Sequence, residues 1–164
     1  MTAPHAAPGF ERKLCPPSVL AARITELPRP LVFTNGVFDL LHRGHVTYLA
    51  RARTLGASLL VALNTDASVK RLGKGDDRPL NARDDRAAVI AALGDVDLVT
   101  WFDTDTPLEL IVAIRPEVLV KGGDWQPEAI VGSREVLGWG GAVHALPFEH
   151  ERSTTALLAK IRER

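Results

Sequence analysis

Five short apolar runs, separated by stretches with helical periodicity, constrain the fold of this chain more than any other feature of its sequence. Runs of this kind are typical of strands buried on both faces of a parallel sheet. Strands that alternate with helices predict an α/β fold, a doubly wound five-stranded parallel sheet with helices on both faces. The expected strands are Leu31–Thr34, Ser58–Leu63, Val96–Trp101, Glu117–Val120 and Ala142–Leu146. The expected helices are Ser18–Leu27, Gly44–Leu55, Asp84–Leu93, Pro107–Ile114, Pro127–Leu137 and Ser153–Arg162.

The length and the charge balance limit the kind of protein this is. A chain of 164 residues suits one core, and 46% apolar with 24% charged residues is a globular composition. We expect one domain over residues 31–164, preceded by an N-terminal tail and a short helix over 1–30. The chain has 20 basic and 20 acidic residues, so its net charge favours neither a nucleic-acid partner nor a membrane partner.

Two further absences from the sequence bear on location and redox chemistry. No apolar run approaches the roughly 20 residues that cross a bilayer, and the first residues lack the apolar core of a signal peptide, so we expect a cytoplasmic protein. Cys15 is the single cysteine, beside Pro16 and Pro17. It has no cysteine partner for a disulfide or a metal site, and we expect an incidental surface thiol.

Polar or glycine-bearing loops follow four of the expected strands. In doubly wound sheets, ligands bind outside the carboxyl ends of the strands, where the strand order reverses. The four loops are therefore expected to converge on one edge and to form one binding site. They contain Thr34–Gly36, Asn64–Asp66, Lys121–Asp124 and Ser153–Thr155.

The first of these loops carries two histidines at the start of a helix. Gly36 and Gly44 allow the backbone to approach a phosphate, and a helix N-terminus presents unpaired N–H groups to an anion. His42 and His45 are three residues apart, so they can share one face and donate hydrogen bonds to charge that develops on a phosphoryl group. A cap or surface role is the alternative for each histidine. A metal-binding pair is a further alternative, but no third ligand is evident and no HExxH pattern is present, so we predict no protein-bound metal.

The same loop resembles a known family signature. TNGVFDLLHRGH is similar to the pattern T-x-G-x-F-D-x-x-H-x-G-H of the cytidylyltransferase-like nucleotidyltransferases. Within that family, the stretches VALNTDASVKRL, RPLNARDDRAAVIAAL, VLVKGGDW, IVGSREV and LPFEHERSTTALL look most similar to the D-glycero-β-D-manno-heptose 1-phosphate adenylyltransferases, also called ADP-heptose synthases. The resemblance extends from about Leu31 to Ile161.

The resemblance implies a Rossmann-like fold of the HxGH type and an enzyme that acts on small molecules. The reaction would join AMP from ATP to heptose 1-phosphate, giving ADP-heptose and pyrophosphate for lipopolysaccharide or another surface glycan. It implies Mg²⁺ carried mainly by the nucleotide phosphates, and a homodimer. Two alternatives stay open, a cytidylyltransferase acting on glycerol 3-phosphate or another polyol phosphate, and a non-catalytic nucleotide-binding sensor. A Rossmann dehydrogenase is disfavoured because no GxGxxG follows the first strand.

The resemblance also assigns residues to roles. His42 and His45 would grip the α- and β-phosphates, and a basic stretch with Arg71 and Lys74 would close over the phosphates as a flap, unless it is an ordinary solvated loop. Asn64 and Asp66 would reach sugar hydroxyls or form a turn, and the hydroxyls of 153–155 would cap the last helix and bind phosphate. The purine and ribose of the nucleotide would lie beside the segment Lys121–Trp125. The full expected nucleotide- and substrate-binding set is Thr34, Asn35, Gly36, Phe38, Asp39, Gly44, Asn64, Asp66, Arg86, Lys121, Gly122, Asp124, Ser153, Thr154 and Thr155.

Four residues keep two interpretations at this stage. Asp39 organises metal or sugar phosphate, or it fixes its own loop. Arg86 meets the acceptor phosphate, or it pairs with a nearby aspartate, Asp85 or Asp97. Trp125 stacks on a ligand or is a half-buried core residue. Glycerol-phosphate relatives have an arginine before the last helix that this chain lacks at the usual place. Arg152 lies nearby in the sequence and either substitutes for that arginine or has no such role.

Overall fold

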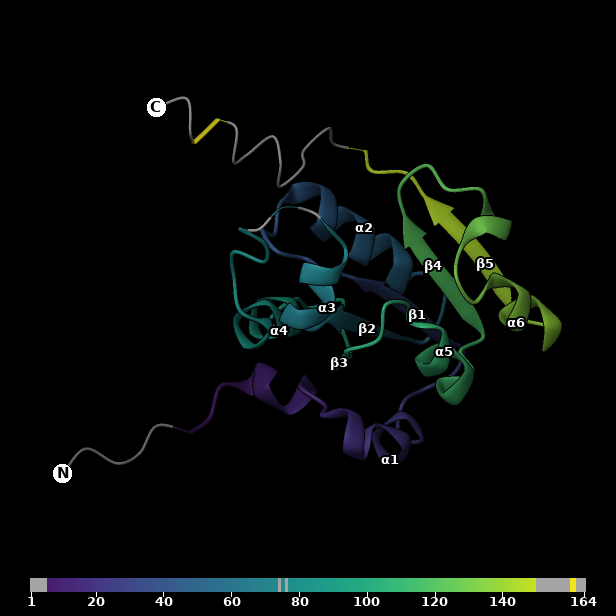
Figure 1. Cartoon of the computed structure of the whole chain (residues 1–164). Coiled ribbons are helices and arrows are strands. Elements are labelled where there is room, and N and C mark those ends of the chain that lie inside the picture. The colour runs from purple at the N-terminus through teal and green to yellow at the C-terminus, as the bar shows by residue number, and fades with distance from the viewer. Residues whose placement is uncertain (1–5, 74, 76, 150–159, 162–164) are drawn as a thin grey trace.

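The computed structural model describes residues 6–73, 75, 77–149 and 160–161, and it contains a five-stranded sheet in which all strands are parallel. The strand order is β3-β2-β1-β4-β5, so the predicted Rossmann-like doubly wound fold is confirmed (Figure 1). The register pairs Leu31 with Ser58 and Val32 with Val118. The strands are β1 Leu31–Gly36, β2 Ser58–Asn64, β3 Leu98–Phe102, β4 Val118–Gly122 and β5 Ala142–Leu146.

The sheet is covered on both faces because its strands are apolar on both sides. Alternate residues of β2 show this, since Leu59 and Val61 face one apolar cluster and Leu60 faces the other. The first cluster packs under α2 (Arg43–Arg53) and α4 (Arg83–Ala91), and the second under α1 (Leu20–Ile24), α5 (Leu108–Ile114) and α6 (Ser133–Gly138). Figure 1 shows α2 and α5 on opposite sides of the strands.

Two helical stretches differ from the prediction. The helix expected over Pro127–Leu137 is a 3₁₀ turn, η3 (Pro127–Ala129), followed by α6, because Gly132 between them adopts a left-handed φ of +87°. A short helix that the sequence pattern did not predict, α3 (Asp66–Arg71), follows β2 and is capped by the side chain of Thr65. The helix expected over Ser153–Arg162 lies almost entirely outside the described residues.

The segment before the sheet packs into the same core. A 3₁₀ turn, η1 (Gly9–Lys13), leads to Leu14, which forms an isolated parallel bridge with Val99 of β3. A second turn, η2 (Pro17–Val19), leads into α1. Cys15 is completely buried and its N–H donates to the carbonyl of Val99 over 2.8 Å. The predicted surface thiol is therefore wrong, and burial raises the pKa of the Cys15 thiol. Within the described part of the chain, no helix has the length and apolar character needed to span a bilayer.

Candidate active site

The strand order reverses between β1 and β4, and the residues that end these two strands meet there. The ammonium group of Lys121 donates to the backbone carbonyl of Asn35 over 3.2 Å and to its side-chain oxygen over 3.4 Å. In doubly wound sheets this reversal point is where the loops part and leave a crevice. Two of the predicted loops therefore converge as expected.

The two histidines of the first loop stack against each other at the start of α2. His42 is the N-cap of the helix, and its carbonyl accepts from the N–H groups of His45 over 2.9 Å and Val46 over 3.2 Å. The imidazole centroids lie 3.8 Å apart with 24° between the ring planes. Both side chains are half-buried and lie at a helix end that attracts anions.

Aromatic rings hold His45 in place. Phe38 and Phe148 meet the ring of His45 edge-on, with centroid distances of 5.2 Å and 5.9 Å. Phe38 adopts a left-handed φ of +48°, which turns its ring back beneath the loop. Gly36 leaves the space for that turn, because a Cβ there would lie 2.8 Å from the Phe38 ring. The expected roles of Gly36 and Phe38 in nucleotide binding stay predictions, but both residues shape the histidine site.

Burial and the neighbouring ring keep His45 uncharged. Burial, and then the nearby His42, lower the pKa of His45 to about 4, while a backbone hydrogen bond at Leu40 acts in the opposite direction. At neutral pH the imidazole therefore carries one N–H donor and one acceptor nitrogen. A phosphate placed against it would favour the charged form and raise this pKa. The site is thus suited to take up an anion together with a proton.

Thr34 lies beneath the site rather than at its surface. Its side chain is fully buried, and its hydroxyl lies 2.5 Å from that of Tyr48, which also donates to the carbonyl of Val120 over 3.3 Å. Burial raises the pKa of the Tyr48 phenol. Because Thr34 is flanked in the sheet by Val61 and Val120, this position does not support the expected backbone contact with a triphosphate. The residue instead ties α2 to the sheet.

Asp39 fixes its own loop. One carboxylate oxygen accepts from Arg78 over 2.9 Å, and the other accepts from the N–H groups of Leu80 and Asn81 over 2.8 and 3.0 Å. Burial raises the pKa of Asp39, but the hydrogen bonds from Asn81, Leu80 and Arg78 outweigh it and hold the pKa below its ordinary value. Of the two interpretations that the sequence left open, the contacts favour the structural one.

Arg86 braces the same loop from below. Its guanidinium is fully buried and donates to the carbonyls of Asn81, Val37 and Asn64 and to the carboxylate of Asp66. The pairing with Asp85 or Asp97 that we considered is wrong, since Asp97 pairs with Arg53 over 2.8 Å. These contacts do not support a direct contact of Arg86 with an acceptor phosphate. They explain why a charged side chain sits under the ligand-side edge, where it joins the loops that follow β1 and β2.

Arg71 also has partners that its sequence position did not reveal. It ends α3, and its Nε donates to the carboxylate of Asp105 over 2.7 Å, while its Nη2 contacts the carbonyl and the carboxylate of Asp103. These contacts turn Arg71 toward the loop between β3 and α5. The expected phosphate contact of Arg71 stays a prediction that they do not support. Lys74, Arg152 and the hydroxyls of Ser153, Thr154 and Thr155 lie outside the described residues.

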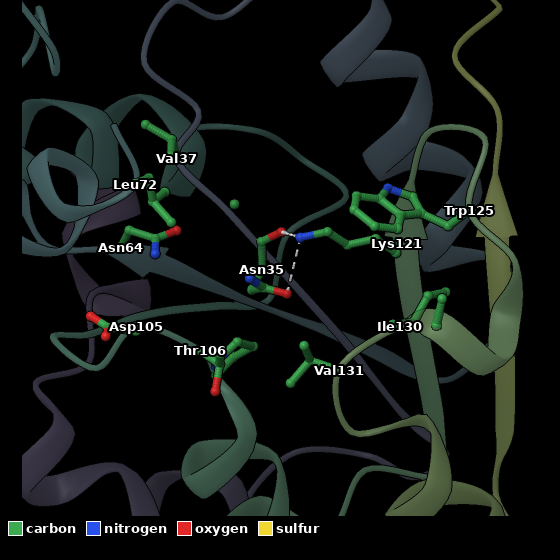
Figure 2. A pocket seen from close by; sticks show the side chains of 13 residues that line it. Asn35, Val37, Asn64, Leu72, Asp105, Thr106, Lys121, Trp125, Ile130 and Val131 are labelled. Atoms are coloured by element: carbon green, nitrogen blue, oxygen red, sulfur yellow. Dashed lines mark hydrogen bonds between the residues drawn. The ribbon is translucent and has the colours of Figure 1, made fainter. Parts of the chain in front are cut away.

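A cavity of about 250 Å³ opens beside Asn35 and Lys121. Figure 2 shows its walls, with Lys121 and Trp125 on one side and Asn64 and Asp105 on the other. Trp125 is 49% exposed, donates to the carbonyl of Gly122 over 3.2 Å and belongs to neither apolar cluster, so the half-buried side chain is not a core residue. Asp124 is exposed and does not line the cavity. The lining residues are Asn35, Gly36, Val37, Asn64, Leu72, Asp105, Thr106, Pro107, Lys121, Trp125, Ala129, Ile130 and Val131.

A family model described as cytidylyltransferase-like matches residues 33–157, which contain both the histidine loop and the cavity. The chain belongs to the cytidylyltransferase-like family. It is 60% identical, over 94% of its own length and 96% of the other, to a D-beta-D-heptose 1-phosphate adenylyltransferase from Bordetella bronchiseptica. It is also 54% identical, over 83% of its length, to a bifunctional protein HldE from Trichlorobacter lovleyi, of which it spans 28%.

Two solved structures share the fold of this chain. A lipopolysaccharide core biosynthesis protein from Thermoplasma volcanium GSS1 is 27% identical, with a TM-score of 0.60 over 74% of this chain and 98% of the other. A pantoate-beta-alanine ligase from Francisella tularensis is 12% identical, with a TM-score of 0.61 over 87% of this chain and 68% of the other, and it shares the fold alone.

The sequence did not predict some of the residues that line the cavity. Asp105 and Thr106 follow β3, and Ile130 and Val131 precede α6. The sequence does carry a signal for the first pair, because Thr104–Pro107 is a polar loop after an expected strand, like the four loops predicted to form the binding site. No polar signal marks the second pair, which contributes only apolar surface. Among the described residues, no three His, Cys, Asp or Glu side chains gather as a metal site.

Proposed function

We propose that the chain is an adenylyltransferase that transfers AMP from ATP to D-glycero-β-D-manno-heptose 1-phosphate, giving ADP-heptose and pyrophosphate. The observation that carries the proposal is the 60% identity to a protein of that name over nearly the full length of both chains. The stacked histidines at the α2 entrance supply a site for the reacting phosphates, and the cavity beside Lys121 supplies one for an acceptor.

The reaction needs no covalent enzyme intermediate. An oxygen of the sugar phosphate attacks the α-phosphorus of ATP, the bond to the bridging oxygen breaks, and pyrophosphate leaves with its Mg²⁺. His42 and His45 would donate hydrogen bonds to the charge that moves onto the phosphoryl oxygens, while the helix N-terminus favours the same charge. Positioning and charge neutralisation are then the protein's contribution, as in phosphoryl transfer generally.

The residues around the histidines would act by positioning. Phe38 and Phe148 fix the orientation of His45, and Asp39 and Arg86 fix the loop that leads to it. A neutral His45 would donate one hydrogen bond to the triphosphate, whose negative charge would raise the pKa of the ring. Lys74 and the hydroxyls of 153–155 would complete the phosphate site. A homodimer in the cytoplasm is part of the same proposal and is supported by the family resemblance.

The test is pyrophosphate release from ATP or CTP with a panel of acceptors that includes heptose 1-phosphate and glycerol 3-phosphate. The proposal predicts the highest kcat/KM for ATP with heptose 1-phosphate, and a preference for CTP with a polyol phosphate would support the cytidylyltransferase alternative. Nucleotide binding without turnover of any pair would support the sensor alternative instead.

Removing either imidazole should then slow the chemical step. His42→Ala and His45→Ala are each expected to lower kcat by about 10²- to 10³-fold, by analogy with the loss of one oxyanion-hole donor. His144→Ala, in β5 and outside the cavity lining, is the matched control and should keep kcat within about threefold. Near-normal kcat in a folded His42 or His45 variant would reject the assigned role, and circular dichroism would check folding.

A further inference from the structure

We propose that Asp105, held by Arg71, binds hydroxyl groups of the acceptor and so makes the enzyme prefer a polyhydroxylated sugar phosphate. The inference rests on the proposed function, because it assigns the cavity beside Lys121 to the acceptor. It names a specificity-determining residue that lies outside the histidine loop.

The cavity has opposite charges on its two walls. Lys121 stands on one side, tied to Asn35, and Asp105 stands on the other, as Figure 2 shows. The side chains of Asn64 and Thr106 line the wall on the Asp105 side and add polar atoms to it. A ligand with an anionic end and a hydroxyl-bearing end matches this arrangement in one orientation, with its phosphate toward Lys121.

The size of the cavity favours the acceptor over the whole nucleotide. Its volume of about 250 Å³ lies below the roughly 300–1,000 Å³ of pockets that hold drug-sized ligands. A single sugar phosphate fits such a space, whereas a nucleoside triphosphate needs the additional room at the α2 entrance. Val37 follows β1 directly and lines the cavity, so the acceptor would lie within one short loop of the histidines.

The carboxylate of Asp105 is oriented in advance. Arg71 donates to its Oδ1 over 2.7 Å, and no hydrogen bond among the described residues uses its Oδ2. A carboxylate oxygen is a strong acceptor for sugar hydroxyls and repels phosphate, so Oδ2 would receive the hydroxyl end of the substrate. Asp105 itself is an exposed side chain, which places this contact at the mouth of the cavity.

The loop that carries Asp105 is pinned to α3. The hydroxyl of Ser68 donates to the carbonyl of Thr104 over 3.0 Å, and the hydroxyl of Thr104 donates to the carbonyl of Thr106 over 2.7 Å. The amide of Asn64 donates in turn to Ser68 over 2.9 Å, which connects the loop to the end of β2. A loop fixed in this way loses little conformational entropy when it binds a ligand, so its polar groups can discriminate between acceptors.

The experiment compares Asp105→Asn with the wild type in steady-state kinetics. Loss of a charged hydrogen-bond acceptor should raise KM for heptose 1-phosphate by about 10- to 100-fold. We expect kcat and the KM for ATP to stay within about twofold, and the KM for glycerol 3-phosphate to change far less than that for the heptose. Asp103→Asn is the matched control, because it removes a carboxylate from the same loop and from the neighbourhood of Arg71, but Asp103 does not line the cavity.

Three results would overturn the inference. An unchanged KM for heptose 1-phosphate would show that Asp105 does not bind the acceptor. A raised KM for ATP alone would assign the cavity to the nucleotide. An equal effect of Asp103→Asn would show that Asp105 only stabilises its loop. If the wild type forms no ADP-heptose, the proposed function fails separately. Calorimetric titration of heptose 1-phosphate in the presence of a non-hydrolysable ATP analogue then decides the inference. Weaker binding to Asp105→Asn supports it, and equal binding, or none to the wild type, rejects it.

Discussion

Acidification should destabilise the fold through His45, and a His45→Gln variant should escape this loss. The pKa of His45 lies at about 4 in the folded protein against 6.5 in the unfolded chain, so the unfolded chain binds the proton first as the pH falls. For a histidine whose folded pKa is lowered, stability is fully present above 6.5 and is lost progressively down to 4. Relative to neutral pH, this difference in pKa lowers the free energy of unfolding by about 2 kcal/mol at pH 5 and by about 3 kcal/mol below pH 4.

The measurement is urea unfolding of both proteins at pH 8, 7 and 5. The free energy of unfolding of the wild type should fall by about 2 kcal/mol more than that of His45→Gln between pH 7 and pH 5. Groups that do not interact with His45 cancel in this difference, and the difference should be close to zero between pH 8 and pH 7. Equal losses in the two proteins would refute the reasoning, because they would mean that the ring of His45 is protonated in the fold as readily as in water.

Two further perturbations test how the histidine loop is held. Gly36→Ala places a Cβ 2.8 Å from the Phe38 ring, so it should lower the free energy of unfolding in thermal melting by about 1–3 kcal/mol and should also lower turnover. Gly138→Ala, where nothing lies within 4 Å of the added Cβ, should change neither stability nor turnover. A Gly36→Ala protein as stable and active as the wild type would show that Phe38 moves aside at no cost. Asp39→Asn removes one charge of the largely buried pair with Arg78 and should lower the free energy of unfolding by about 3 kcal/mol in urea at pH 7. The loss should shrink as acid protonates Asp39 in the wild type too, and because the pKa of Asp39 is lowered this should happen only below the ordinary range of an aspartate. A loss that does not depend on pH would contradict this account.

Sequence patterns were sufficient for the sheet and for the convergence of the loops that follow β1, β2 and β4. Apolar runs identify strands because burial on both faces requires them, and β5 has the predicted bounds. The helix α3 was missed because its six residues, DASVKR, are too short and too polar to show a helical period. The break at Gly132 depends on a backbone angle that local composition does not determine.

Partner choice in the site was harder to predict than the site's position. Arg86 is buried under two loops because its guanidinium donates to three carbonyls that only the folded chain brings together. Arg71 turns to Asp105, 34 residues away, rather than toward a phosphate. Composition alone also suggested a surface position for Cys15, whereas the bridge from Leu14 to Val99 draws it inside. Such long-range pairings leave no periodic trace in a single sequence.

The bridge between Leu14 and Val99 has a consequence for how the protein can be altered. The strand β3 lies at one of the two edges of the sheet, and part of its free backbone edge is occupied by Leu14 and Cys15 of the same chain. Shortening the protein to begin after Cys15 would open that edge to pairing with foreign strands, a known route to aggregation. A purification tag is therefore safer when it is joined before Gly9 than when it replaces the residues up to Cys15.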